Sequence, residues 1–161
     1  MTTVGEGIFE QNTWANDKLI DACSGLTEEQ LDLEAPGTYG SVRSTLIHLV
    51  GAQARYVARL SGEPPVDPDP AAGLPDLRAI AASTGARLTE LATSMNADEL
   101  LERNFQGEKY EVEASVILVQ VINHATEHRS HVRTVLSKHG IDTPELDGWT
   151  WGEAAGKLKK R

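Results

Sequence analysis

Apolar residues recur along this chain at the three- and four-residue spacing of amphipathic helices. Four segments carry this pattern, and they cover residues 6–24, 42–61, 76–95 and 113–139. Ser41 stands directly before the second segment, and serine is a preferred residue at the start of a helix. Four helices of this length can bury their apolar stripes against one another. The pattern therefore predicts an all-α fold, with an antiparallel four-helix bundle as its natural form.

The segments between these helices have distinct characters. Five of the seven prolines lie between residues 62 and 75, and proline blocks helix formation, so this stretch is expected to be a long extended connection. Neither the part before this stretch nor the part after it is a complete domain, so we expect residues 1–161 to form a single domain. Residues 102–112 contain a central glycine and are expected to form a loop or a small hairpin.

Composition narrows the class of protein. Hydrophobic residues make up 40% of the 161 residues, which is typical of a globular protein. The formal net charge of −9 argues against a nucleic-acid partner, because phosphate groups bind basic surfaces. The single cysteine, Cys23, excludes an intramolecular disulfide and a cysteine-rich zinc module. No apolar run approaches the roughly 20 residues that span a bilayer, and the first residues lack a signal-peptide pattern. We therefore expect a cytoplasmic protein with no membrane partner.

Histidine carries the candidate chemistry. His124 and His128 are four residues apart in the fourth helical segment, so both rings project from one face. Two imidazoles at this spacing can bind one metal ion, although two half-buried histidines held by hydrogen bonds fit the spacing as well. His48 lies off the apolar stripe of its helix, and periodicity alone places it on the surface.

Three stretches together resemble a known family: residues 12–16, 40–50 and 121–132. Their Ser-(x)n-Leu-x-His and Asn-His-x-x-x-His-Arg elements, in this order, resemble those of the DinB-like superfamily of metalloenzymes, along most of residues 8–140. The resemblance implies a four-helix bundle with up-up-down-down connectivity. It also implies a divalent metal ion held by His48, His124 and His128, which moves His48 from the surface into the site.

One departure from the family pattern concerns the residues after the second metal-site histidine of the fourth helix. The family usually has Gly-Gln where this chain has Ser130-His131. The extra imidazole of His131 could be a fourth ligand, a base or a side chain without a role, and we favour the last. Proteins of this type are often homodimers.

Three histidine ligands leave a metal ion with an open position for water or substrate, which is the composition of a catalytic site. Zinc is expected first and nickel second, with iron or manganese as further candidates. Relatives similar to thiol S-transferases or isomerases suggest that His48, His124 and His128 serve catalysis, in which the metal activates a low-molecular-weight thiol toward a small electrophilic substrate. The alternatives are metal-assisted hydrolysis, with Glu127, His131 or a residue from elsewhere in the chain as the base, and a non-catalytic metal-binding module of the stress response.

Overall fold

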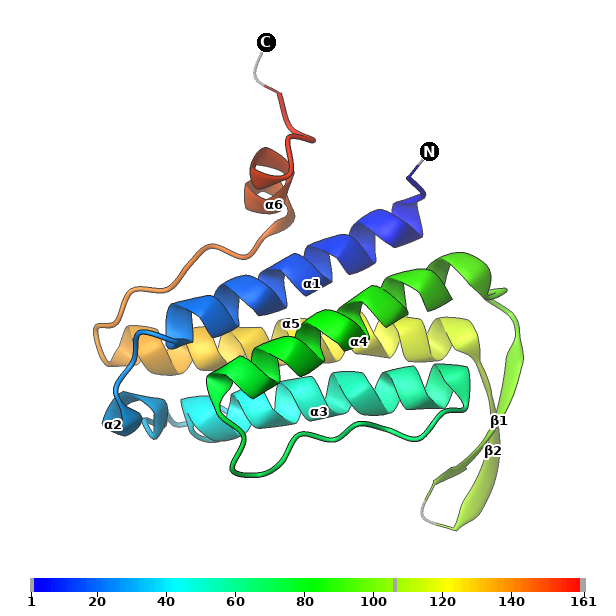
Figure 1. Ribbon diagram of the computed structural model, residues 1–161, viewed down its shortest axis with the longest axis horizontal. Coiled ribbons are helices and arrows are strands. Elements are labelled where there is room, and N and C mark those ends of the chain that lie inside the picture. The colour runs from blue at the N-terminus through cyan, green and yellow to red at the C-terminus, as the bar shows by residue number, and fades with distance from the viewer. Residues whose placement is uncertain (1, 106, 160–161) are drawn as a thin grey trace.

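The computed structural model describes residues 2–105 and 107–159, and the four predicted segments are helices in it. They are α1 (Val4–Cys23), α3 (Val42–Ser61), α4 (Leu74–Ser94) and α5 (Ala114–Lys138). The bounds of α3 are those predicted, and those of the other three differ by one or two residues. The four helices pack as one bundle (Figure 1), which confirms the all-α fold class. A short helix, α2 (Glu28–Leu31), follows Thr27, whose side chain forms a capping box with Gln30.

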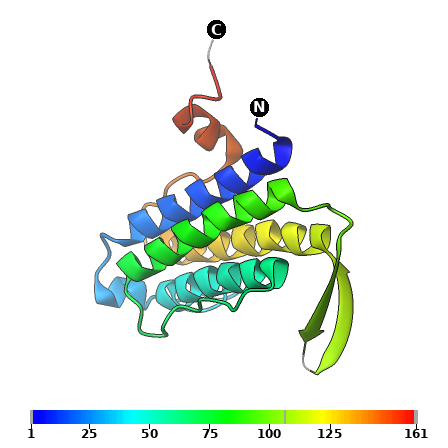
Figure 2. The ribbon, with the colours of Figure 1, turned by 45° about the vertical axis from the view of Figure 1, so that its right-hand side comes forward.

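The directions of the helices differ from the expected order. In Figures 1 and 2, α3 and α4 run the same way, and α1 and α5 run the opposite way. Two contacts agree with parallel α3 and α4. Gln53, in the middle of α3, donates a hydrogen bond to the carbonyl oxygen of Ala81 in α4. Glu63, just beyond the end of α3, forms an ion pair with Arg87, which lies later in α4. The order is therefore up-down-down-up. An up-up-down-down bundle needs two connections that return along its length, whereas only the stretch between α3 and α4 does so here.

This returning connection lies closely against α3. Pro68 is buried, and a Cβ atom built on Gly51 of α3 would approach its Cδ to 3.2 Å. Asp67 forms an ion pair with Arg55 of α3, with 2.6 Å between Oδ1 and the guanidinium nitrogen. The predicted extended, proline-rich connection is thus confirmed, and glycine at position 51 gives it the room to approach.

A hairpin joins α4 to α5. Its strands are β1 (Leu100–Phe105) and β2 (Glu108–Glu113), paired antiparallel with Leu100 opposite Glu113. Gly107 has a φ of 88°, a left-handed conformation that glycine adopts without steric cost. The structure thus decides between the predicted loop and hairpin in favour of the hairpin, in which residue 106 lies outside the described residues.

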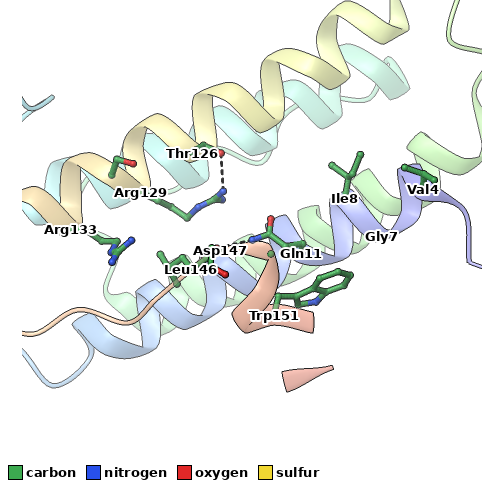
Figure 3. A pocket seen from close by; sticks show the side chains of 12 residues that line it. Val4, Gly7, Ile8, Gln11, Thr126, Arg129, Arg133, Leu146, Asp147 and Trp151 are labelled. Carbon is green, nitrogen blue, oxygen red and sulfur yellow. Dashed lines mark hydrogen bonds between the residues drawn. The ribbon is translucent and has the colours of Figure 1, made fainter. Parts of the chain in front are cut away.

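The sequence pattern did not predict a sixth helix, α6 (Gly148–Ala154). It is too short for apolar periodicity, and its signal is Asp147, whose side chain accepts hydrogen bonds from the backbone N–H groups of Trp149 and Thr150. In Figure 3, Trp151 of α6 lies beside α1, where it approaches Gly7. The segment after α5 therefore folds back and covers the first half of α1.

In the described part of the chain, the core of the bundle consists of two clusters of buried apolar side chains, and several polar side chains are buried in the bundle as well. The largest fully buried side chains come from all four long helices and include Leu19, Ile20, Leu46, Leu49, Leu77, Leu88, Val132 and Leu136. Among the described residues, we find no helix with the length and hydropathy needed to cross a membrane. One side of α5 faces α3, and another side faces α1 and α6. The candidate functional residues described below lie on these two sides.

Candidate metal centre

The three predicted histidines meet between α3 and α5. His48 lies in the first half of α3, and His124 and His128 lie one turn apart on α5, which runs antiparallel to α3 beside it. Ser41 fixes the start of α3, because its side chain accepts a hydrogen bond from the N–H of Ser44. The surface position that periodicity gave His48 is wrong, since its ring is half-buried against α5.

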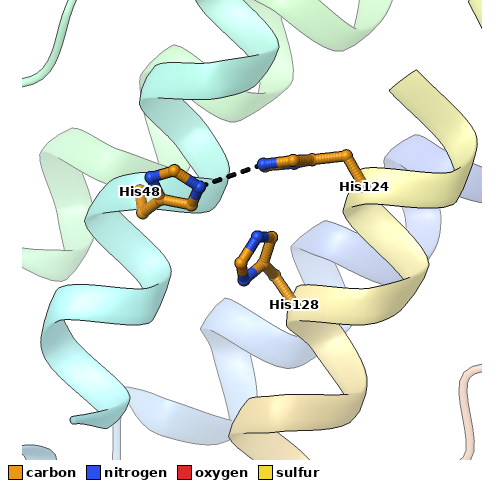
Figure 4. A group of neighbouring side chains, drawn as sticks. All are labelled: His48, His124 and His128. Atoms are coloured by element: carbon orange, nitrogen blue, oxygen red, sulfur yellow. Dashed lines mark hydrogen bonds between the residues drawn. The ribbon is translucent and has the colours of Figure 1, made fainter. Parts of the chain in front are cut away.

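The three rings converge on one point. Nε2 of His48 lies 3.0 Å from Nε2 of His124, and the ring centroids of the three side chains are 4.3 to 4.9 Å apart. One ligand nitrogen from each ring lies within 4.8 Å of the other two, and Figure 4 shows a nitrogen of each turned toward the space between them. Metal–imidazole bonds are about 2.1 Å long. The rings can therefore take up a common ion with small adjustments.

The electrostatics favour the neutral imidazole, which is the ligand form. Burial lowers the pKa of His124 to about 4, with smaller contributions from the charges of His128, His48 and Arg55. Burial also lowers the pKa values of His48 and His128, each with help from a neighbouring positive charge. All three rings are thus unprotonated near neutral pH. This donor set fits a divalent ion such as zinc or nickel.

These lowered pKa values predict acid-sensitive stability of the metal-free protein. A histidine with its ordinary pKa near 6.5 in the unfolded chain takes up a proton there before it does so in the folded chain. The free energy of unfolding should therefore fall as the pH drops from about 6.5 toward 4, where His124 itself titrates. Urea unfolding of chelator-treated protein measures the slope. His124→Gln should flatten it, His139→Gln should leave it unchanged, and an equal slope in both variants would contradict the prediction.

Tyr39 is a member of the site that the sequence analysis missed. It lies in the turn before α3, with its ring stacked on His48 at 4.2 Å between centroids and its hydroxyl 3.0 Å from His48 Nδ1. Its ring also lies nearly perpendicular to that of His128, with 5.0 Å between the centroids. The tyrosine therefore fixes the orientation of His48 and leaves Nε2 for the shared space. No spacing rule links a turn tyrosine to a ring nine residues later, so no pattern in the chain pointed to it.

Other residues with expected roles lie apart from the three rings. His131 is half-buried with its ring 5.3 Å from that of His128, and its Nδ1 has no hydrogen-bond partner among the described residues. It is not in the group of converging ligand atoms. Glu127 is exposed, and Cys23 is buried in the core, where burial raises the pKa of its thiol to about 12. Within the described part of the chain, neither a carboxylate nor the thiol thus joins the centre.

A cleft lies beside His48 and has that side chain in its wall. It measures about 410 Å³ and is bounded by α3 and the proline-rich connection. Tyr39, Ser44, Arg55 and Pro68 contribute to its walls. A volume of this size accommodates a small molecule. Of the three histidines, the cleft thus reaches His48, next to Tyr39 and the connection.

A buried polar network begins at Arg129, the residue after His128 in the sequence. The guanidinium of Arg129, next to His128, donates to Asn12 Oδ1 at 2.7 Å and to Asn16 Oδ1 at 2.8 Å. Asn16 donates in turn to Gln53 Oε1 at 3.0 Å, and Gln53 donates to the Thr84 hydroxyl at 2.7 Å. One chain of hydrogen bonds therefore ties α5 through α1 and α3 to α4.

Two comparisons with known proteins bear on the chain. The model of the DinB family matches residues 1–157, which is nearly the whole chain. No curated protein matches it.

Proposed function

The chain belongs to the DinB family, and from that membership and the three converging histidines we propose that it is a divalent-metal-dependent enzyme. His48, His124 and His128 hold the ion, zinc in the first instance and nickel in the second. The observation that carries the proposal is the placement of one nitrogen from each of the three rings within 4.8 Å of the others. Three protein ligands leave a coordination position open, which is the mark of catalytic rather than structural sites.

We propose thiol transfer as the reaction. When bound, the ion would act as a Lewis acid that favours the thiolate form of a low-molecular-weight thiol. The thiol sulfur forms a bond to an electrophilic carbon of the substrate, the leaving group departs with the bonding electrons, and the thiol proton passes to solvent. An external nucleophile is needed because Cys23 is buried with a raised pKa. The cleft beside His48 offers space for the small substrate.

The chain's own residues prepare this site. Tyr39 and α3 hold the His48 ring in place, and burial keeps the three imidazoles neutral. Glu127, the carboxylate considered as a base for hydrolysis, is exposed and outside the group of three rings. His131, the histidine considered for the same role, is also outside that group. Thiol transfer needs no protein base, which is why we prefer it to hydrolysis.

The decisive experiment compares thiol-dependent and thiol-independent turnover. Zinc- and nickel-loaded protein is incubated with bacillithiol, mycothiol or glutathione and an activated aryl halide, and separately with an activated ester without thiol. We expect thioether formation that requires both metal and thiol, is lost in His48→Ala and persists in His139→Ala. Cleavage of the ester without thiol would show that the protein is a hydrolase and not a thiol transferase. If the metal-loaded protein shows no activity in either assay, the protein is a non-catalytic metal-binding module.

Tyr39→Phe tests the support of the centre. Removal of the hydroxyl takes away the partner of His48 Nδ1, and loss of such a partner to a metal-bound histidine typically weakens metal binding about 10- to 100-fold. Competition with a chromogenic chelator measures the affinity. Tyr110→Phe is the matched control, because its hydroxyl bonds to Glu108 on the distant hairpin. Equal affinities in the two variants would exclude a role of Tyr39 in holding His48.

A further inference from the structure

A second cavity lies on the side of α5 that faces away from the histidines. It has a volume of about 620 Å³, and its walls come from α1, α5, α6 and the segment that leads into α6. Figure 3 shows Arg129 and Arg133 reaching into it from α5, opposite Ile8 of α1 and Trp151 of α6. Volumes of this order accommodate small organic ligands. The cavity is thus large enough to bind one, independently of the metal centre.

The segment over the cavity is fastened to α1. Gln11 donates from Nε2 to the carbonyl oxygen of Leu146 at 2.8 Å. Beyond α6, Lys157 forms an ion pair with Glu10 of α1 and lies over the Trp151 ring, 4.6 Å from its centroid. These contacts hold Trp151 against α1. The cavity is therefore a built feature of the fold.

Arg129 gives the cavity an uncompensated positive charge. Its side chain is nearly buried, with 6% of the residue exposed, and its acceptors are all neutral: the amide oxygens of Asn12 and Asn16 and the hydroxyl of Thr126. These bonds use three of the five N–H groups of a guanidinium, so two remain for a ligand. A buried charge is costly unless an opposite charge accompanies it. No carboxylate pairs with Arg129 among the described residues.

The other charges around the cavity have their own partners. Arg133 forms an ion pair with Glu145 at 3.1 Å. The carboxylate of Asp147 accepts the two backbone N–H groups that begin α6. Among the described residues, Arg129 is therefore the arginine of the cavity wall without a carboxylate within ion-pair distance, and Ile8, Leu146 and Trp151 contribute apolar surface beside it. A ligand with one negatively charged group and an apolar chain would complement this arginine and the apolar wall beside it.

We propose that this cavity binds a small monocarboxylate with an apolar chain. Its carboxylate receives the two remaining N–H groups of Arg129, and its chain lies against Ile8 and Trp151. Arginine suits this task because its planar fork matches the two oxygens of a carboxylate. The site is separate from the metal centre, since Arg129 and His128 project from different sides of α5, and it does not rest on the proposed transferase activity.

Calorimetric titration with octanoate tests the proposal on the full, metal-loaded chain. Replacing Arg129 itself would break the buried network, so the diagnostic variant is Ile8→Glu, at a position that is 45% exposed. The new carboxylate competes for Arg129 and repels the ligand. We expect it to weaken octanoate binding at least tenfold. Val116→Glu, at a position on α5 that is 56% exposed and outside the cavity, should leave binding unchanged.

Octanol and a histidine variant distinguish binding at Arg129 from purely apolar binding and from binding to the metal ion. Octanol, which has the same chain without the charge, should bind at least tenfold more weakly than octanoate, and equal binding would overturn the role of Arg129. His48→Ala should retain octanoate binding. Loss in His48→Ala with retention in Ile8→Glu would place the carboxylate on the metal and refute the proposal, as would the absence of octanoate binding to the wild-type chain.

Discussion

His124→Ala is expected to abolish stoichiometric metal binding. The wild-type chain, loaded and then desalted, should retain about one ion, and the variant less than about a tenth of that, because two imidazoles form a much weaker site than three. His124 lies close to both other rings, with its Nε2 3.0 Å from that of His48 and its ring centroid 4.3 Å from that of His128. Plasma mass spectrometry of untagged protein gives the metal content directly.

The matched control is His139→Ala. His139 is the capping residue directly after α5, and its Nε2 lies 3.1 Å from the carbonyl oxygen of Glu34, away from the three rings. Metal content should be unchanged in this variant. Both proteins should remain folded, because the apolar rows of the four helices carry the stability of the bundle. Stoichiometric metal in a variant that lacks both His124 and His128 would refute the centre.

Asn16→Leu is expected to lower the free energy of unfolding by about 3 kcal/mol. Asn16 is 2% exposed and serves two buried partners, since its oxygen accepts from Arg129 and its amide nitrogen donates to Gln53. Leucine has a similar volume but no polar atom. The substitution therefore leaves a guanidinium N–H and an amide oxygen unpaired inside the bundle, at a cost of about 1–3 kcal/mol each.

Urea unfolding of the metal-free protein at neutral pH measures this effect without a contribution from metal binding. Asn123→Leu is the control, because Asn123 is an exposed asparagine in the interior of α5. Its free energy of unfolding should stay within about 0.5 kcal/mol of the wild type. Equal stabilities of the two variants would show that the Arg129–Asn16–Gln53 network contributes nothing to the fold.

The helices were the most predictable part of the structure. The bounds of α3 follow from Ser41 and the apolar stripe, and both are local properties of the chain. The sequence did not decide between a loop and a hairpin for residues 102–112. Two short strands bury little apolar surface, and their formation depends on pairing with each other. Helix α6 was missed because seven residues are too few for periodicity to register, although Asp147 was a usable capping signal.

The candidate site was predictable only in part. The spacing of His124 and His128 guarantees that their rings share one face of a helix, whatever surrounds it. His48 could not be placed this way, because periodicity gives the angle of a residue around its own helix and says nothing of the neighbouring helix. The family resemblance supplied that information. Tyr39 reaches His48 from a turn, where no periodicity applies.

By itself, the sequence determined four amphipathic helices, an extended connection and a pair of histidines on one helix face, because each depends on the order of residues over a few turns. Only the tertiary structure decided the helix directions, the meeting of His48 with the other two rings and the buried position of Arg129 beside a cavity. These depend on which faces of distant segments pack together. Such packing is set by the summed burial of all four helices and by the one connection that returns along the bundle.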